Sequence, residues 1–334
     1  MFKDVLNQLL NAQDLSHDQM LAVMQQVMGG ELTTAQIAAL LIALRTKGET
    51  VDEIAAAAAV MRKLSTKVVI KDATHLVDTC GTGGDGIQTF NVSTVSAFVA
   101  AAAGAKVAKH GGRSVSSTCG SADVLEVLGV DVNKTPDEVA SSVNEIGIGF
   151  MFAPNHHSAM KHAAPVRKEL GVRTIFNLLG PLTNPASARR QVMGVFDKAL
   201  TGKLAQVLHK LGSEHVLVVH GADGMDEISF TGDSYIAELK DGKVSEYTVN
   251  PKQFGLVVHQ LKDIQIQNAE ESKAMIMDVL NGEKGAPRDI VLLNAGAAIY
   301  AAGIASTLAA GIEKAAQMID NGAALAKLNA LIAA

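Results

Sequence analysis

Apolar residues recur three or four positions apart through the first 65 residues of the chain. Such spacing places the apolar side chains on one face of a helix. Glycines at 29–30 follow the second run, Thr33 precedes the third, and Asp52 and Glu53 open the fourth, all of which are typical of helix ends. The pattern predicts a small helical domain over residues 1–70, with no catalytic chemistry evident in it.

The pattern changes near residue 75, where short apolar runs begin to alternate with helical stretches. That alternation is typical of a mostly parallel sheet. We expect strands at 76–78, 106–108, 191–196 and 216–219, and helices at 92–103, 122–128 and 200–211. A hairpin is expected around Asp241-Gly242, and alanine-rich helices from Glu271. The predicted fold class is α/β, with a small N-terminal helical domain and a larger α/β domain, residues 71–334, that has a mostly parallel central sheet.

Composition narrows the class of protein. The 334 residues are 48% hydrophobic, carry a formal net charge of −5 and include two cysteines, Cys80 and Cys119. The acidic balance gives no reason to expect nucleic-acid binding, and the cysteines lack the spacing of a disulfide framework or a metal site. The N-terminus lacks the build of a signal peptide, and no apolar run reaches the roughly 20 residues of a membrane helix. We therefore expect a soluble cytoplasmic protein with no membrane partner.

A glycine-rich turn, Gly81-Thr82-Gly83-Gly84-Asp85-Gly86, follows the first predicted strand. Glycines let backbone N–H groups approach an anion closely. The letters fit the dinucleotide pattern G-x-G-x-x-G, but that site needs an acidic residue after the second strand. Here the second strand runs into the basic segment Lys109-His110-Gly111-Gly112-Arg113. A P-loop is excluded because no G-x-x-x-x-G-K-[ST] string follows a predicted strand.

Two glycine loops at strand ends, one of them basic, favour a ligand with several phosphate charges, such as a diphosphate. The alternative is that both are ordinary tight turns. Asn91, Ser93 and Thr94 support the binding interpretation, because they stand where a helix is expected to begin. There they can cap the helix while its free N–H groups bind an anion. Four serines precede the next predicted helix in the same way: Ser114, Ser116, Ser117 and Ser121.

Two adjacent carboxylates, Asp226 and Glu227, follow the apolar run 216–219. Mg²⁺ prefers one or two carboxylates together with waters and phosphate oxygens. The pair is therefore a candidate Mg²⁺ site that would serve the phosphate site. The alternative is an ordinary acidic turn.

Two histidines, His156 and His157, stand upstream of Lys161 and Arg167. Together these residues could bind an anionic second substrate, although their spacing alone favours residues on the surface of a helix. A zinc site would need further ligands at suitable spacing, and the sequence lacks them.

Several motifs, in order along essentially the whole chain, resemble the anthranilate phosphoribosyltransferase family. The resemblance rests on residues 81–86, 91–94, 109–111, 120–123, 152–154 and 173–182. It implies a nucleoside-phosphorylase-like fold, a homodimer, and transfer of phosphoribose from phosphoribosyl diphosphate to the amine of anthranilate in tryptophan biosynthesis. Anthranilate's amine is already neutral near pH 7, so we expect no residue to be an essential general acid or base.

The resemblance also implies a set of binding residues. Those around phosphoribosyl diphosphate would be Gly81, Gly84, Asp85, Thr89, Asn91, Val92, Ser93, Thr94, Lys109, His110, Gly111, Gly112, Arg113, Ser114, Val115, Ser116, Ser117 and Ser121. Those around anthranilate would be Gly81, His110, Gly112, His157, Arg167 and Pro181. Those serving Mg²⁺ would be Ser93, Asp226 and Glu227.

One position departs from the family pattern. The family usually has Lys-His-Gly-Asn-Arg where this chain has Gly112 in place of the asparagine. That asparagine would contact anthranilate, and loss of a neutral hydrogen bond costs about 0.5–1.5 kcal/mol. Glycine also loosens the loop. We expect weaker or altered acceptor binding, with little change in the binding of phosphoribosyl diphosphate.

Two other functions compete with this one. The first is an enzyme of related fold with another acceptor, such as a pyrimidine nucleoside phosphorylase, but Arg167 and the segment 176–181 favour an aromatic carboxylate. The second is a non-catalytic relative that binds nucleic acid. The acidic net charge and the intact Asp226-Glu227 pair argue against it.

Overall fold

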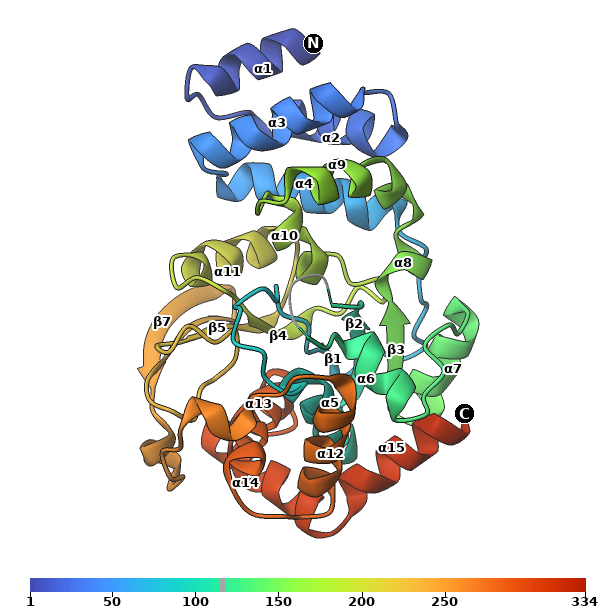
Figure 1. Ribbon diagram of the computed structural model, residues 1–334, viewed down its shortest axis with the longest axis vertical. Helices are drawn as coiled ribbons and strands as arrows, with labels where there is room; N and C mark the ends of the chain where they lie inside the picture. The colour runs from blue at the N-terminus through green and yellow to red at the C-terminus, as the bar shows by residue number, and fades with distance from the viewer. Residues whose placement is uncertain (115–117) are drawn as a thin grey trace.

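Four helices stack at one end of the molecule in this computed structural model, which describes residues 1–114 and 118–334 (Figure 1). They are α1 (Phe2–Leu10), α2 (His17–Gly29), α3 (Thr34–Lys47) and α4 (Val51–Leu64). The side chains of Ser16, Thr33 and Thr50 cap α2, α3 and α4 by accepting a backbone N–H from the first turn. At the other end of α2, Gly30 adopts φ 74°, which closes the helix. The presence of an N-terminal helical domain is confirmed, and its boundary at residue 70 stays a prediction.

A later part of the chain joins this helical layer. The 3-10 helix η1 (Ser158–His162) packs against α2, and α9 (Ala164–Leu170) packs against α3. In Figure 1 both lie in the green segment beside the blue helices. The layer above the sheet is therefore built from two separate stretches of sequence.

Within the described residues, the strands form one seven-stranded sheet in the order β3-β2-β1-β4-β5-β6-β7. The strands are β1 (Leu76–Asp78), β2 (Lys106–Gly111), β3 (Ile148–Phe152), β4 (Arg190–Gly194), β5 (His215–Gly221), β6 (Ser234–Lys240) and β7 (Lys243–Val249). Strands β1 to β5 pair in parallel, and β6 and β7 form an antiparallel hairpin that turns at Asp241 and Gly242. The mostly parallel sheet and the hairpin are both confirmed.

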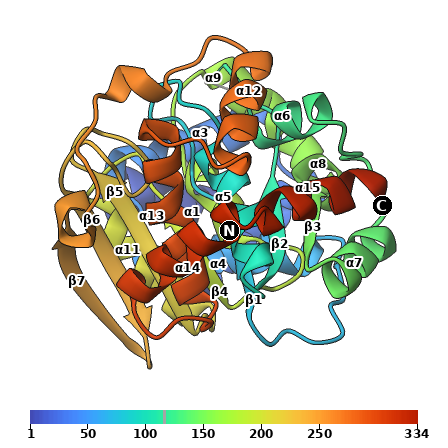
Figure 2. The same cartoon turned by 90° about the horizontal axis from the view of Figure 1, so that it is seen from below.

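The remaining helices connect the strands or cover the sheet. They are α5 (Val92–Ala102), α6 (Ser121–Val127), α7 (Pro136–Glu145), α8 (Ala153–His156), α10 (Phe176–Leu179), α11 (Leu200–Lys210), α12 (Ala269–Leu280), α13 (Ala286–Ala301), α14 (Leu308–Asp320) and α15 (Ala323–Ala333). Three short 3-10 helices accompany them: η2 (Gly180–Leu182), η3 (Pro251–Phe254) and η4 (Leu261–Ile264). Figure 2 shows α13, α14 and α15 lying across the lower face of the sheet.

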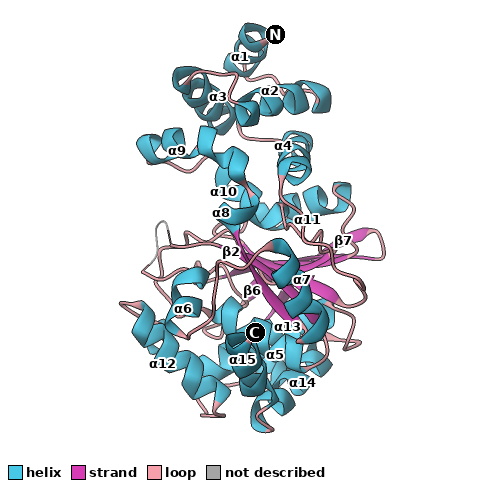
Figure 3. Cartoon of the chain, turned by 90° about the vertical axis from the view of Figure 1, so that its right-hand side faces the viewer, coloured by secondary structure: helices cyan, strands magenta, loops and turns pink. Residues whose placement is uncertain are grey.

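Side chains of the central strands alternate between two hydrophobic cores. Leu217 and Val219 of β5 belong to the core shared with α5 and the C-terminal helices. Val216 and Val218 belong to the core shared with α11 and the helical layer. Since successive side chains of a strand point to opposite faces, one strand serves both cores. Figure 3 shows the sheet lying between these two helical regions.

Strand β3 and helix α7 were not among the predicted elements. Strand β3 is short, and Gly149 interrupts its apolar run. A Cβ at Gly149 would lie 2.8 Å from the Val143 side chain and 2.9 Å from the Val139 carbonyl, so the glycine admits close packing of α7. Gly149 is therefore needed for packing between β3 and α7, and it breaks the run of apolar residues by which a strand is recognised in the sequence. Among the helices described, none is both long and apolar enough to cross a bilayer.

Candidate active site

The predicted site loops meet at one edge of the sheet. Strands β1, β2, β4 and β5 are parallel, so their carboxyl ends lie at the same edge. The chain runs outward in one direction from β1 to β3 and in the other from β4 to β5. The strand order therefore reverses between β1 and β4, and open α/β sheets commonly bind ligands at such a topological switch point.

The glycine turn after β1 folds against the acidic pair. Gly83, Gly84 and Gly86 adopt positive φ of 64°, 78° and 78°, which favours glycine. The Gly83 N–H donates to Asp226 Oδ2 at 2.9 Å, across 143 positions of sequence. At Gly81 a Cβ would lie 3.2 Å from Asp226 Oδ2, so this glycine allows the close approach.

Asp226 and Glu227 are partly buried, and Asp85 lies beside them. Burial, and next the Asp85 carboxylate, raises the pKa of Asp226 to about 7. Burial, and next the Asp226 carboxylate, raises the pKa of Glu227 well above its ordinary value. Carboxylates held this close are stabilised in their charged form by a cation.

The donor set fits a hard divalent cation such as Mg²⁺. Asp226 and Glu227 offer carboxylate oxygens, and within the described chain no three His, Cys, Asp or Glu side chains converge into a complete metal cage. Mg²⁺ suits such a partial site because it retains waters and binds substrate phosphate oxygens. Ser93 belongs to the same region, since its backbone hydrogen-bonds the Glu227 carboxylate.

Lys109 is buried at the end of β2. Its ammonium donates to the Thr79 carbonyl at 2.9 Å and to Ser93 Oγ at 3.2 Å. The same ammonium is close enough to Glu227 to stabilise the charged carboxylate. Lys109 therefore ties the end of β1 to the start of α5, next to the acidic pair.

The residues at the start of α5 differ from the expected capping arrangement. Asn91 precedes α5, but its side chain does not cap the helix. Its amide donates to the Cys119 carbonyl at 3.1 Å and accepts from Ser272 Oγ at 2.7 Å. The expectation that Asn91 caps α5 is wrong, because partners distant in sequence compete for its amide. Val92 and Thr94 are buried, and Thr89 pairs with Gln265 outside the strands.

The second glycine loop follows β2 and packs against α6. A Cβ at Gly111 would lie 2.2 Å from Ser121 Oγ, which explains the glycine. The Ser114 N–H donates to Asp123 Oδ2 at 3.1 Å. Arg113 pairs with Asp123 at 3.0 Å and with Glu126 at 2.6 Å. The predicted residues Val115, Ser116 and Ser117 lie outside the described part of the chain.

Two of the predicted acceptor residues, His110 on β2 and His157 just after α8, lie next to each other. His110 and His157 are buried, with ring centroids 5.1 Å apart. Burial, and next His157, lowers the pKa of His110 to about 3; burial, and next His156, lowers that of His157 to about 4. The expectation that His156 and His157 lie on a helix surface is wrong, because both are buried. The local spacing gives no information on the strands and loops that cover them.

Two further residues predicted for the acceptor lie on other elements, Pro181 in η2 and Arg167 in α9. The Pro181 carbonyl accepts from Gln191 Nε2 at 2.9 Å, and neither ring nitrogen of His110 has a hydrogen-bond partner within the described residues. The same Gln191 amide donates to the Cys80 carbonyl next to Gly81, at 3.2 Å. The Arg167 guanidinium stacks on the Phe176 ring at 5.5 Å, and burial lowers its pKa.

Comparison with known proteins decides the family. A protein of Methylobacillus flagellatus named anthranilate phosphoribosyltransferase is 64% identical over 329 residues, which are 98% of this chain and 96% of that protein. One of Chromobacterium violaceum with the same name is 60% identical over 328 residues, with the same shares covered.

The chain belongs to the anthranilate phosphoribosyltransferase family. It is therefore a glycosyltransferase, of a family that serves tryptophan biosynthesis. Its residues 73–325 match the model described as "Glycosyl transferase family, a/b domain", and residues 3–65 match the helical bundle domain of that family. The recognition from sequence motifs is confirmed.

Solved structures of the family have the same fold. The enzyme of Thermus thermophilus is 42% identical, with a TM-score of 0.93 over 99% of this chain and 98% of that one. The Saccharomyces cerevisiae enzyme, solved in complex with PRPP and Mg, is 28% identical, with a TM-score of 0.88 over 99% of this chain and 97% of that one.

The structure places two further residues beside the glycine turn and the acidic pair that were not among the predicted binding residues, although Arg173 begins the family segment 173–182. A Cβ at Gly194, the last residue of β4, would lie 1.5 Å from the Asp226 carbonyl. Arg173 stacks on the Phe196 ring at 4.0 Å and donates to the Gly84 carbonyl. Arg173 thus contacts the glycine turn, and Gly194 contacts the backbone of the acidic pair. No sequence pattern indicated these contacts, because the partners are distant in sequence.

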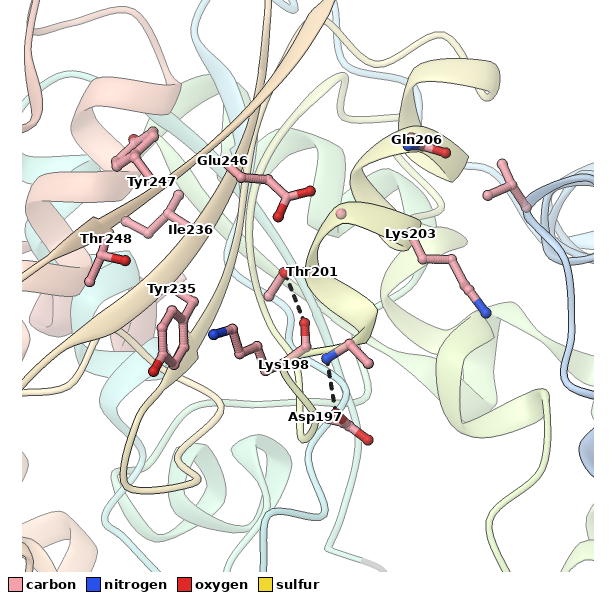
Figure 4. A pocket seen from close by; sticks show the side chains of 13 residues that line it. Asp197, Lys198, Thr201, Lys203, Gln206, Tyr235, Ile236, Glu246, Tyr247 and Thr248 are labelled. Carbon is pink, nitrogen blue, oxygen red and sulfur yellow. Dashed lines mark hydrogen bonds between the residues drawn. The ribbon is translucent and has the colours of Figure 1, made fainter.

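A cavity of about 870 Å³ lies apart from these residues, between α11 and the β6–β7 hairpin (Figure 4). Lys198, Tyr235 and Glu246 line it, and the Lys198 ammonium lies 3.4 Å from the centre of the Tyr235 ring. None of the residues predicted for this family's substrates lines it.

Proposed function

We propose that the chain catalyses Mg²⁺-dependent transfer of phosphoribose from 5-phosphoribosyl 1-diphosphate to anthranilate, giving N-(5-phosphoribosyl)anthranilate and diphosphate. The observation that carries this proposal is the 2.9 Å hydrogen bond from the Gly83 N–H to Asp226 Oδ2. It joins the anion-binding turn to the acidic pair at the switch point. The yeast relative in complex with PRPP and Mg supports the proposal.

The donor would lie along the glycine loops. The backbone N–H groups of Gly83 and Ser114 already donate to Asp226 and Asp123, so those of residues 84–86 would donate to its phosphates, with the side chains of Ser93 and Ser121 nearby. Asp226 and Glu227 would hold the cation, and Ser93 would lie beside it. Bound Mg²⁺ neutralises charge on the departing diphosphate.

The acceptor would lie between His110, His157 and Pro181. Both histidines are neutral near pH 7, so Arg167 would be the positive partner of the anthranilate carboxylate. Within the described chain, no carboxylate lies within ion-pair distance of Arg167. Its charge is therefore available for a ligand.

The reaction needs no strong base in this proposal. The C1–O bond breaks with its electron pair leaving on diphosphate, and the nitrogen lone pair forms the C1–N bond. The amine then loses one proton to diphosphate or water. The residues act by holding the two substrates in line, which removes much of the entropic cost of the encounter.

Loss of anthranilate fluorescence on addition of phosphoribosyl diphosphate and Mg²⁺ tests the function. We expect the signal to require both additions, to stop with a chelator, and to fall at least about 100-fold in Asp226→Asn, since charge stabilisation at the leaving group is lost. Activity unaffected by chelator and by Asp226→Asn would contradict the proposal. Phosphate-dependent cleavage of thymidine would instead support a nucleoside phosphorylase.

We also propose that Gly112 weakens anthranilate binding relative to an asparagine at the same position. A Cβ at Gly112 would meet no atom within 4 Å, and φ there is not positive, so a side chain fits. We expect Gly112→Asn to lower the KM for anthranilate by about two- to tenfold, one neutral hydrogen bond's worth. The KM for phosphoribosyl diphosphate serves as the internal control and should not change. An unchanged anthranilate KM would refute the idea.

We propose finally that the chain forms a homodimer in the cytoplasm. Leu10 and Ile42 of the helical layer are 69% and 39% exposed, which suits an interface there. Cys80 and Cys119 are free thiols, as in a reducing compartment. Sedimentation should give twice the mass of the chain, and Leu10→Lys should lower it; a monomer at micromolar concentration would contradict the dimer.

A further inference from the structure

The residue after the acidic pair, Ile228, is held by a side chain rather than by a strand. Strand β5 ends at Gly221 and β6 begins at Ser234, so the acidic pair lies on the connection between them. The Asn294 amide donates to the Ile228 carbonyl at 2.9 Å, and its Oδ1 accepts from the Ile228 N–H, also at 2.9 Å. The amide thus pairs with both polar groups of one backbone residue, as a neighbouring strand would.

Asn294 is a polar residue within the apolar stretch 290–299 of α13 (Ala286–Ala301). It lies in α13, where almost every residue is buried, and is itself 2% exposed. Burying an amide is costly unless it is hydrogen-bonded. The three contacts of Asn294, two to Ile228 and one from Nδ2 to the Ile290 carbonyl at 2.9 Å, meet that requirement. An amide side chain supplies a donor and an acceptor side by side in one plane, which matches the N–H and carbonyl of one residue.

The acidic pair is fixed from the opposite side as well. The Asp226 carbonyl lies against Gly194 of β4, and the Asp226 carboxylate accepts from the Gly83 N–H. Nearer β5, Asp223 Oδ2 accepts from the hydroxyls of Ser229 and Thr231, each at 2.6 Å. The connection between β5 and β6 is thus held at Asp223 and Asp226. Asn294 holds it at Ile228, the residue after Glu227.

We propose that Asn294 is a positioning residue for the divalent-cation site, an inference that rests on the proposed function. Asn294 itself contacts neither the carboxylates nor the substrates. It sets the backbone from which the Glu227 carboxylate projects, one residue before Ile228. Outer partners of this kind typically change metal affinity about 10- to 100-fold when removed.

The variant Asn294→Leu tests this role, because leucine keeps the branched shape of asparagine and removes all three of its hydrogen bonds, including both to Ile228. The probe is Mn²⁺ with inorganic diphosphate, followed by electron paramagnetic resonance, which needs no turnover. We expect Mn²⁺ affinity to fall by at least about tenfold, with the KM for anthranilate unchanged. The matched control is Ile299→Ala, a fully buried position in the same helix, which should lose stability and keep wild-type Mn²⁺ affinity.

Wild-type Mn²⁺ affinity in folded Asn294→Leu, or an equal loss in Ile299→Ala, would overturn the inference. If Asn294→Leu does not fold, Asn294→Ser decides by the same measurement, since serine is too short to span both groups of Ile228. Partial recovery of Mn²⁺ affinity in Asn294→Gln over Asn294→Leu would support the amide's role. If the wild-type chain binds no Mn²⁺ with diphosphate, the proposed function itself fails, which separates the two outcomes.

Discussion

Under the proposed function, the neutral histidines beside the acceptor would leave Arg167 as the positive partner of its carboxylate. Burial lowers the pKa of His110 to about 3 and that of His157 to about 4, so both rings are uncharged at neutral pH. Neutral rings suit contact with an aromatic acceptor, and they do not compete with Arg167 for its carboxylate. In the proposed site, His110 and His157 would contact the aromatic ring of the acceptor, and Arg167 would bind its carboxylate.

The same burial makes stability depend on pH. An unfolded histidine binds a proton below about pH 6.5, whereas folded His157 does so only below about 4. The unfolded chain thus binds more protons in this range, so the free energy of unfolding falls as pH falls, by about 1.4 kcal/mol per pH unit for each such group.

We expect His157→Gln to make this decrease shallower by about that slope between pH 6 and 4.5, as measured by urea unfolding. The control His17→Gln, at an exposed position, should keep the wild-type slope. Identical slopes in wild type and His157→Gln would show that His157 is not responsible.

At the scale of secondary-structure elements, the acidic pair is held by a close contact between the end of β4 and the connection that follows β5. Strand β4 ends at Gly194, and the Asp226 carbonyl occupies the space that a Cβ would need there. The connection after β5 can thus lie directly on β4. Any side chain at Gly194 would move the acidic pair away from the glycine turn.

We expect Gly194→Ala to lower the free energy of unfolding by at least about 1–3 kcal/mol, since overpacking forces backbone shifts, and to weaken Mg²⁺-dependent activity as well. Gly232→Ala is the control, because a Cβ there meets no atom within 4 Å and φ is not positive. Chemical unfolding and Mg²⁺ titration of turnover measure both effects. Equal behaviour of the two variants would mean that the contact between Gly194 and Asp226 does not position the acidic pair.

At the scale of the whole molecule, Arg62 links the helical layer to the acceptor side of the sheet. It lies on α4, and its guanidinium donates to the Leu182 carbonyl at 2.6 Å and to the Leu211 carbonyl at 3.1 Å. Leu182 follows Pro181 directly. The helical layer therefore supports the proposed anthranilate pocket as well as packing on the sheet.

We expect Arg62→Met to lower the free energy of unfolding by about 1.5–3 kcal/mol, the usual contribution of hydrogen bonds to a charged group. We also expect the KM for anthranilate to rise more than that for phosphoribosyl diphosphate. Lys63→Met, at the exposed neighbouring position, should change neither quantity. Equal increases in both KM values would mean that the link is not specific to the acceptor side.

The sequence predicted those parts of the fold that local signals specify. Thr33 and Gly30 mark helix ends through contacts within a few residues, and both lie where the pattern placed them. The glycine turn was equally visible because three of its glycines need positive φ. Strand β3 was missed because its single pairing with β2 depends on tertiary contacts.

The site was predictable only in its local pieces. Nothing near Ile228 in sequence shows that its backbone pairs with Asn294, 66 positions away. Nothing near His157 shows that it is buried. Contacts between distant segments decide both, and one sequence carries no direct record of them.

The sheet order has a consequence for synthesis on the ribosome. Gly83 meets Asp226 only after 143 further residues have been made, and Ile228 meets Asn294 after 66 more. Contacts so distant in sequence form late and slowly. A nascent chain that ends before α13 would carry the glycine turn and the acidic pair without the Asn294 contacts to Ile228. We therefore expect full affinity for the cation to be acquired only with the last quarter of the polypeptide.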